Sequence, residues 1–248
     1  MNTRTLKLNC DMGEGLDLID EEIMPYVGMA NIACGFHAGD LETMKKTVAL
    51  AKQYQVQIGA HPSFKDKEHF GRREMACSEE EIITLVQEQC KTLERICQSN
   101  DASMVYIKPH GALYNMMMKE MHIFKTLCKA LSLHNKQLKL MILSNSQNAA
   151  YANIAQGYDI DLLYEVFADR AYTDEGQLVP RSQPGALLHT EEEVLHRAKT
   201  LLTSGYIESI NGKQITLEAD TLCVHSDTQG ALALIKTLHN FLEETHAS

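Results

Sequence analysis

Short apolar runs recur along the chain, and most of them lead directly into a cluster of polar residues and glycines. Each run is largely apolar, as is typical of strands that are covered on both faces. Seven runs have the length of a strand, at residues 5–10, 29–34, 56–60, 104–108, 138–143, 162–167 and 221–225. The pattern therefore predicts seven buried strands.

Helical periodicity separates most of these runs. Two segments begin with a capping box, in which a hydroxyl residue precedes a glutamate by three positions: Ser78 with Glu81, and Thr190 with Glu193. The second of these helices is predicted to end at Gly205, since glycine commonly follows the last helical residue. Apolar spacing predicts further helices over residues 41–54, 116–134 and 146–156, and from Gln229 onward.

Strands that alternate with helices indicate parallel βα units with right-handed crossovers. We therefore predict an α/β fold, a TIM-like (βα)7 barrel of parallel strands, in preference to an open doubly wound sheet. No long linker, charge block, low-complexity tract or repeat marks a boundary, so residues 1–248 are expected to form a single barrel domain. A small hairpin with a tight turn at Asn211 and Gly212 is predicted before the last strand.

Composition narrows the classes of partner. The chain has 248 residues and a formal charge of −10, which argues against binding to nucleic acid or to an anionic membrane surface. No apolar run approaches the roughly 18 residues of a membrane helix, and the first residues lack the apolar middle region of a secretory signal, so a cytoplasmic location is expected. The seven cysteines are scattered and form no C-x-x-C pair, which predicts reduced thiols.

Six of the seven predicted strands run into a polar, mostly glycine-containing cluster at their carboxyl side. In a barrel of parallel strands these ends meet at one mouth, where catalytic side chains from separate strands surround a substrate. Asp40 has a simpler alternative role as the cap of the helix that follows it, and His37 or His225 alone can be a structural histidine. The clusters place these polar residues at the mouth: Asp11, Glu14, His37, Asp40, His61, Lys108, His110, Arg170, His225 and Asp227.

Two chemistries suit such a mouth. Asp11, His61 and His110 are candidate ligands of a divalent metal, although no local ligand spacing supports the trio. Alternatively, carboxylates and histidines activate water without a metal, while Lys108 stabilises the oxyanion that forms. Both describe hydrolysis at a carbonyl-like carbon. The chain has no G-x-S-x-G elbow, and it has neither G-x-x-x-x-G-K-[ST] nor G-x-G-x-x-G, so no common nucleotide site is indicated.

A set of long motifs resembles one protein family. The stretches "LNCDMGEG", "MPYVGMANIACGFHAGD", "IGAHPSF", "FGRREM", "KPHGALYN", "EVFADRAY", "GQLVPRSQPGA" and "CVHSD" are similar to the LamB/YcsF family, over about Leu8 to Ala231. Characterised members of that family are the A subunits of bacterial ATP-dependent 5-oxoprolinases. The family usually has His-Gly-Asp where this chain has His225, Ser226 and Asp227.

The resemblance implies a barrel of the glycoside hydrolase and deacetylase type. It also implies hydrolysis of the lactam of 5-oxo-L-proline to L-glutamate, coupled to ATP hydrolysis, together with subunits B and C. Our hypothesis is that the partner subunits activate the lactam with Mg-ATP and that this mouth performs the hydrolysis. Carried over by motif, the catalytic group is Asp11, Glu14, His61, Lys108 and His110. The residues implied to contact substrate or phosphate are His37, Asp40, Arg72, Arg170, His225 and Asp227.

Two other functions remain open at this point. One is a metal-dependent amide hydrolase or deacetylase that acts alone, for which tightly bound metal and partner-independent turnover are the marks. The other is a non-catalytic ligand-binding subunit, which would bind 5-oxoproline without turnover.

Overall fold

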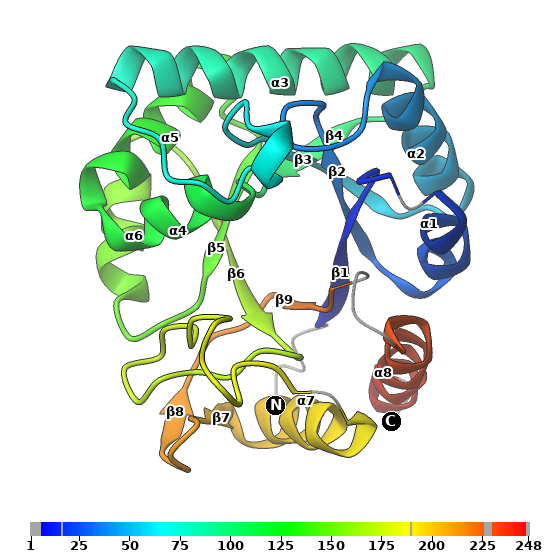
Figure 1. Ribbon diagram of the computed structural model, residues 1–248, viewed down its shortest axis with the longest axis vertical. Helices are drawn as coiled ribbons and strands as arrows, with labels where there is room; N and C mark the ends of the chain where they lie inside the picture. Colours follow the sequence, from blue (N-terminus) through cyan, green and yellow to red (C-terminus); the bar gives the residue numbers. More distant parts are fainter. Residues whose placement is uncertain (1–5, 16, 189, 226–229, 247–248) are drawn as a thin grey trace.

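The computed structural model describes residues 6–15, 17–188, 190–225 and 230–246. Within these residues, seven parallel strands close into a barrel in the order β1-β2-β3-β4-β5-β6-β9, and Figure 1 looks into the ring that they form. The strands are β1 (Lys7–Met12), β2 (Met29–Ala33), β3 (Gln57–His61), β4 (Met104–Ile107), β5 (Lys139–Leu143), β6 (Leu162–Phe167) and β9 (Thr221–Cys223). Each lies within two residues of a predicted run, so the predicted barrel is confirmed.

The short last strand closes the ring. β9 pairs in parallel with β1, where Thr221 lies opposite Lys7, and also with β6, where Thr221 lies opposite Glu165. Three residues thus join the first and sixth strands of the barrel. Because all seven strands are parallel, their carboxyl ends share one rim, as the prediction of a common mouth requires.

Helices cover the outside of the ring (Figure 1). Both predicted capping boxes are formed, at Ser78 with Glu81 and at Thr190 with Glu193. The longer helices are α2 (Leu41–Gln53), α3 (Glu79–Ser99), α5 (Met121–His134), α6 (Asn148–Gln156), α7 (Glu191–Ser204) and α8 (Ala231–His246).

One predicted helix was wrong. The segment predicted as a helix over residues 116–134 is two helices, α4 (Gly111–Lys119) and α5, which meet at Glu120. Glu120 has an extended backbone, with φ −123° and ψ 104°, and its amide donates a hydrogen bond to the Met116 carbonyl. No glycine or proline marks this break, so the continuous apolar pattern concealed it.

Several short elements complete the chain. The predicted hairpin is present as β7 (Tyr206–Glu208) and β8 (Gln214–Thr216), which pair antiparallel, with Gly212 at φ +79° in the turn. α1 (Asp17–Ile23) and the 3-10 turns η1 (Met24–Tyr26) and η2 (Lys67–His69) were not predicted.

No helix in the described ranges is long and apolar enough to cross a membrane. None of the seven cysteines, all of which lie in the described ranges, forms a disulfide, as expected.

The interior of the barrel below the mouth is filled by a polar chain around one tyrosine. A Cβ atom on Gly59 would lie 2.1 Å from the Tyr106 ring, so the missing side chain makes the space that the ring occupies. The Tyr106 hydroxyl donates to Asn31 Oδ1 (2.7 Å), Asn31 Nδ2 donates to Asn9 Oδ1 (2.8 Å), and Asn9 Nδ2 donates to Thr221 Oγ1 (2.9 Å). These bonds satisfy buried polar groups directly beneath the residues of the mouth.

Candidate active site at the barrel mouth

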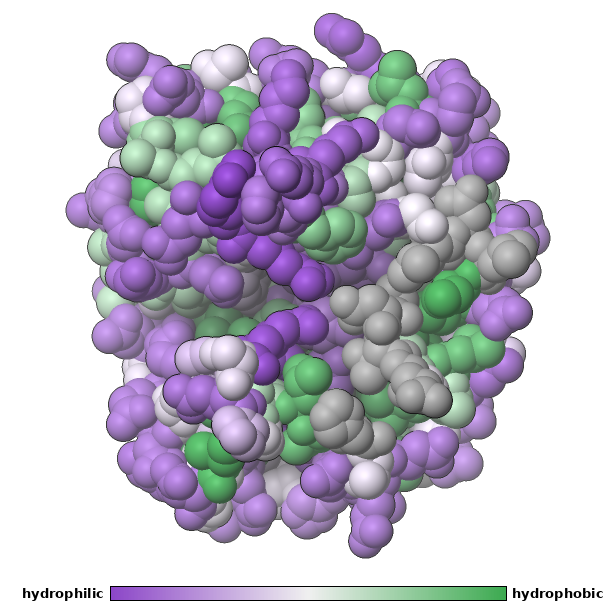
Figure 2. Space-filling view, viewed as in Figure 1, coloured by the Kyte–Doolittle hydropathy of each residue, from purple (hydrophilic) through white to green (hydrophobic). Residues whose placement is uncertain are grey.

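A cavity of about 750 Å³ opens among the strand ends, a volume typical of small-molecule sites. The face of the molecule in Figure 2 is hollowed near its centre, and many of the side chains that border the hollow are hydrophilic. The cavity wall includes eight residues that the sequence placed in the site: Asp11, Glu14, His61, Arg72, Lys108, His110, Arg170 and His225.

Lys108 follows β4 and is 3% exposed. Its ammonium lies 2.8 Å from Glu165 Oε1 and 3.0 Å from Asp11 Oδ1, and it donates to Asn9 Oδ1 at 3.3 Å. Burial alone lowers the pKa of Lys108, but the neighbouring Asp11, Cys223 and Glu165 outweigh it and hold this pKa well above its ordinary value. Lys108 is therefore a fixed positive charge on the cavity wall.

Asp11 lies on β1 two positions after Asn9, so both side chains point into the barrel. Asp11 Oδ1 accepts a hydrogen bond from Asn31 Nδ2 at 2.8 Å, and Oδ2 lies 3.4 Å from His61 Nε2. Burial alone raises the pKa of Asp11, but His61 and Lys108 lower it further than burial raises it, to well below its ordinary value. Asp11 is thus a carboxylate at neutral pH, within reach of the cavity.

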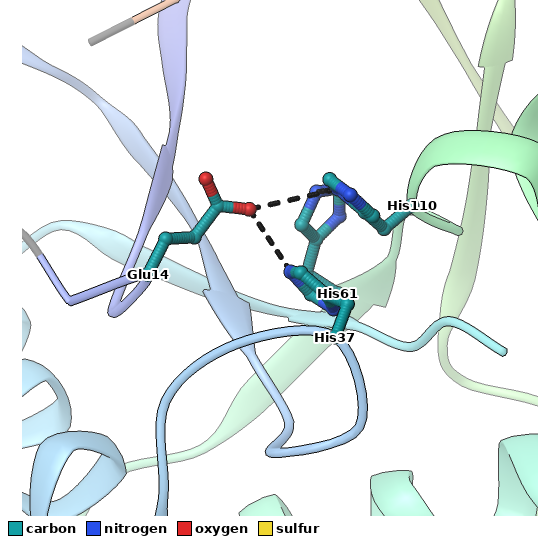
Figure 3. A group of neighbouring side chains, drawn as sticks. All are labelled: Glu14, His37, His61 and His110. Atoms are coloured by element: carbon teal, nitrogen blue, oxygen red, sulfur yellow. Dashed lines mark hydrogen bonds and ion pairs between the residues drawn. The ribbon is translucent and has the colours of Figure 1, made fainter. Parts of the chain in front are cut away.

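Four side chains from the carboxyl ends of separate strands and the loops after them meet at the mouth (Figure 3). Glu14 follows β1, His37 follows β2, His61 ends β3, and His110 caps the start of α4. Glu14 Oε1 lies 2.9 Å from His37 Nε2 and 3.5 Å from His110 Nδ1, and His110 Nδ1 lies 2.9 Å from His61 Nε2. One potential ligand atom of each residue lies within 4.8 Å of the others. These four residues are called the tetrad below.

Two of the tetrad histidines, His37 and His110, are kept neutral by their surroundings. Burial and the neighbouring His61 lower the pKa of His37 to about 2, and the same two causes hold the pKa of His110 far below its ordinary value. The rings of His37 and His110 stack in parallel, with centroids 3.8 Å apart. Neutral imidazoles of this kind are the form that binds metals.

The sequence named Asp11 with His61 and His110 as candidate metal ligands. In the structure Glu14 and His37 join the two histidines instead, and Asp11 lies against the Lys108 ammonium. Sequence spacing had no means of choosing between the two carboxylates, since both lie at the end of β1 and are only three positions apart.

The remaining predicted site residues divide into two groups. Arg72 and Arg170 are on the cavity wall, and so is His225, whose Nδ1 lies 2.8 Å from Asp169 Oδ2. Asp40 is not on that wall: it is exposed, and its Oδ1 accepts a hydrogen bond from the Thr43 amide at the start of α2, the capping role considered above. Ser226 and Asp227 lie outside the described residues.

Comparison with known proteins identifies the family. The sequence model of the LamB/YcsF family matches residues 6–248. The chain belongs to the LamB/YcsF family. This confirms the resemblance drawn from the motifs, and it extends to nearly every residue of the chain.

Individual relatives are similar to this chain over nearly its whole length. The 5-oxoprolinase A subunit from Vibrio cholerae serotype O1 is 45% identical over 98% of this chain and 100% of its own length. The relative of the same name from Chromohalobacter salexigens is 40% identical over 94% of this chain and 95% of its own length. The crystal structure of the lactam utilization protein from Thermus thermophilus superposes with a TM-score of 0.89 at 34% identity, covering 98% of this chain and 97% of that one.

Several site residues of this LamB/YcsF chain were missed by sequence reasoning. Glu165 on β6 accepts a hydrogen bond from the Tyr114 hydroxyl at 2.9 Å and pairs with Lys108, while Asn9 and Asn31 support Asp11 from below. Each of the three strand residues is a polar side chain inside an apolar run. That irregularity was the available signal, because a polar residue in a buried strand must find partners inside the barrel.

Proposed function

We propose that this chain is the ring-opening component of an ATP-dependent 5-oxoprolinase, which converts 5-oxo-L-proline to L-glutamate. The observation that carries the proposal is the Lys108 ammonium fixed between Asp11 and Glu165 on the wall of a cavity of small-molecule size. Relatives over the full length of the chain are named as the A subunit of 5-oxoprolinase, and a structural neighbour is named for lactam utilization. Both support a cyclic amide as the substrate.

The need for ATP follows from the chemistry of the substrate. A lactam is stabilised by resonance, and phosphorylation of its oxygen makes the carbonyl carbon a better electrophile. We assign that step, with Mg-ATP, to partner subunits B and C, because this sequence contains neither of the common nucleotide motifs sought above. A supply of ATP also favours a cytoplasmic location.

Asp11 and Lys108 suit the step that follows. Water adds to the activated carbon, the C–N bond breaks as the nitrogen takes up a proton, and hydrolysis of the resulting acyl phosphate releases phosphate and glutamate. Asp11, a carboxylate at neutral pH, accepts the proton of the attacking water. Lys108 offsets the negative charge that develops on the oxygen. Both side chains line the cavity, so they reach the same bound molecule.

Arginines on the cavity wall suit a phosphorylated substrate. Arg72, Arg170 and Arg181 all line the cavity. Arg170 is 8% exposed, its Nη2 donates to the Val179 carbonyl at 2.7 Å, and its Nε has no hydrogen-bond partner among the described residues. Guanidinium groups bind phosphate with paired hydrogen bonds, so we assign these three residues to the phosphoryl group.

The test is a reconstitution. Release of L-glutamate and phosphate from 5-oxoproline and Mg-ATP is measured with this chain alone, with subunits B and C alone, and with all three components. We expect coupled release only in the complete mixture. Active B and C preparations that yield no glutamate when this chain is added would refute the proposal, and turnover of simple amides by this chain alone would favour a stand-alone amide hydrolase.

A matched pair of variants tests the phosphate assignment. Arg181→Gln removes an exposed guanidinium from the cavity wall, and Arg95→Gln removes one from the exposed face of α3. We expect Arg181→Gln to raise the concentration of B and C needed for half-maximal glutamate release and Arg95→Gln to leave it unchanged. Equal behaviour of the two variants would remove Arg181 from the site.

A further inference from the structure

Within the tetrad, His110 Nδ1 and His61 Nε2 lie 2.9 Å apart. If both rings are neutral with the tautomers argued below, neither nitrogen has a proton to donate to the other. We propose that Glu14, His37, His61 and His110 bind a divalent transition-metal ion of the zinc type at the edge of the cavity. Hydrogen bonds to backbone carbonyls fix the tautomers of His61 and His110.

Two backbone carbonyls determine where the ring protons lie. His61 Nδ1 is 2.7 Å from the Lys108 carbonyl oxygen, and His110 Nε2 is 2.9 Å from the Phe70 carbonyl oxygen. A carbonyl oxygen only accepts, so His61 carries its proton on Nδ1 and His110 carries its proton on Nε2. In the neutral rings, His61 Nε2 and His110 Nδ1 are then both bare lone pairs.

These two bare nitrogens face each other at 2.9 Å. Two lone pairs at that distance repel, unless a positive charge lies between them or beside them. Glu14 Oε1, a further electron-pair donor, lies 3.5 Å from His110 Nδ1 and 2.9 Å from His37 Nε2. A group of four candidate ligand atoms that all lie within 4.8 Å of one another is the arrangement expected of a cation site (Figure 3).

The outer contacts are also those of metal ligands. A histidine that binds a metal with one nitrogen usually donates its other N–H to a carbonyl or carboxylate, which fixes the ring and its tautomer. His61 and His110 both do so, through the carbonyls of Lys108 and Phe70. Because the outer nitrogen of each ring is bonded to a carbonyl, the inward nitrogen of each ring keeps its lone pair for a metal ion.

The spacing of the donors suits zinc. Bonds of 2.0–2.1 Å in a tetrahedral site put neighbouring donor atoms about 3.3 Å apart. Three donor distances within the tetrad lie between 2.9 and 3.5 Å, and the other pairs of candidate ligand atoms lie within 4.8 Å. Three imidazoles and one carboxylate favour zinc, iron, nickel or copper, whereas magnesium and calcium prefer oxygen ligands.

The loop after β3 holds the rings in place. Gly71, at φ +62°, has no side chain, and a Cβ atom there would lie 2.9 Å from His37 Cβ and 3.2 Å from His110 Cδ2. The loop backbone therefore packs directly against the His37 side chain at Cβ and against the His110 ring. Such close packing keeps donors in position before an ion binds.

The place of the ion suggests its use. Glu14, His61 and His110 line the cavity, so an ion held by them faces the bound molecule, where it would polarise an oxygen or bind the attacking water. This role rests on the proposed function, whereas ion binding does not.

The experiment is a metal titration of the full chain. Protein stripped with a chelator is titrated with Zn²⁺ and, separately, with Mg²⁺ by calorimetry, and its melting temperature is recorded with and without Zn²⁺. Visible absorption after loading with Co²⁺ reports the ligand geometry. We compare wild type with His61→Gln, Glu14→Gln and the control His225→Gln, a mouth histidine that pairs with Asp169.

We expect wild type to bind a single Zn²⁺ per chain, to show no binding of Mg²⁺ in the titration, and to melt at a higher temperature with Zn²⁺. His61→Gln and Glu14→Gln should weaken Zn²⁺ binding by roughly a hundredfold or more, whereas His225→Gln should change it by less than about threefold. Glu14→Gln keeps the test valid if His61→Gln does not fold, because the Glu14 side chain is partly exposed.

Absence of Zn²⁺ binding by folded wild type would overturn the inference, and so would equal loss in the His225→Gln control. The metal titration and the reconstitution can fail independently of each other. If Zn²⁺ binds at the tetrad but the reconstituted mixture releases no glutamate, the metal site is supported and the oxoprolinase proposal is rejected. Full turnover by chain shown to be metal-free would reject a role for the ion in the reaction and would support the oxoprolinase proposal.

Discussion

Replacing Lys108 with methionine tests how strongly the buried ammonium stabilises the barrel mouth. The ammonium lies 2.8 Å from Glu165 Oε1 and 3.0 Å from Asp11 Oδ1, and Glu165 is fully buried. Methionine keeps most of the side-chain length but leaves both carboxylates without their cation. Removing one partner of a buried ion pair costs about 3–5 kcal/mol, and we expect a loss of that size in the free energy of unfolding.

The assay is urea unfolding at neutral pH, followed by far-ultraviolet circular dichroism. Lys136→Met is the matched control, because Lys136 pairs with Asp159 at 2.6 Å on the surface and both side chains are more than half exposed. Surface ion pairs of this kind contribute little to the free energy of unfolding, so the unfolding curve of Lys136→Met should match that of wild type. Adding Glu165→Gln to Lys108→Met should recover part of the loss, since one unpaired charge is then removed. Lys108→Met with the same stability as Lys136→Met would refute the reasoning.

Three further predictions concern the surroundings of the site. Gly59→Ala should destabilise the fold by about 1–3 kcal/mol in urea unfolding, because the added Cβ would lie 2.1 Å from the Tyr106 ring, and the cost should fall in a Tyr106→Ala background. Gly111→Ala should lower the melting temperature, since this residue sits at φ +55° and its Cβ would lie 2.5 Å from a backbone carbonyl oxygen of the loop after β3; an unchanged melting curve would contradict this. Burial raises the pKa of Asp169 but His225 lowers it further, so the net shift is downward and the carboxylate stabilises the fold above about pH 4, the unfolded value. Asp169→Asn should therefore be less stable than wild type at pH 7, and urea unfolding should show the difference shrinking as the pH falls below about 4.

The barrel could be predicted because buried parallel strands have a recognisable sequence pattern, a short apolar run that ends in glycines and polar residues. The same pattern located Asp11, His61 and Lys108, whose meeting follows from topology alone. The break at Glu120 could not be predicted, because its extended backbone depends on how α4 and α5 pack and not on a helix-breaking residue.

Membership of the tetrad also lay beyond the sequence. Glu14 and His37 stand on loops, and only the folded structure shows that Glu14 groups with the three histidines. Asp11 contacts His61 alone among the tetrad contacts given above and pairs with Lys108. Glu165, by contrast, was within reach. A glutamate in the middle of the apolar run 162–167 needs a buried cation, and Lys108 at the end of another run offers one.

The central claim is that ring opening takes place at this mouth, and the ratio of L-glutamate to phosphate released by the reconstituted enzyme tests it most directly. Asp11→Asn keeps the shape of the side chain but removes the base. With wild-type chain we predict equal amounts of the two products. With folded Asp11→Asn we predict that glutamate release falls by about a hundredfold or more, since loss of a general base typically costs that much. Phosphate release should continue, because the phosphorylated lactam that is not opened loses its phosphoryl group to water and returns to 5-oxoproline. Equal and undiminished release of both products from the variant would contradict the account.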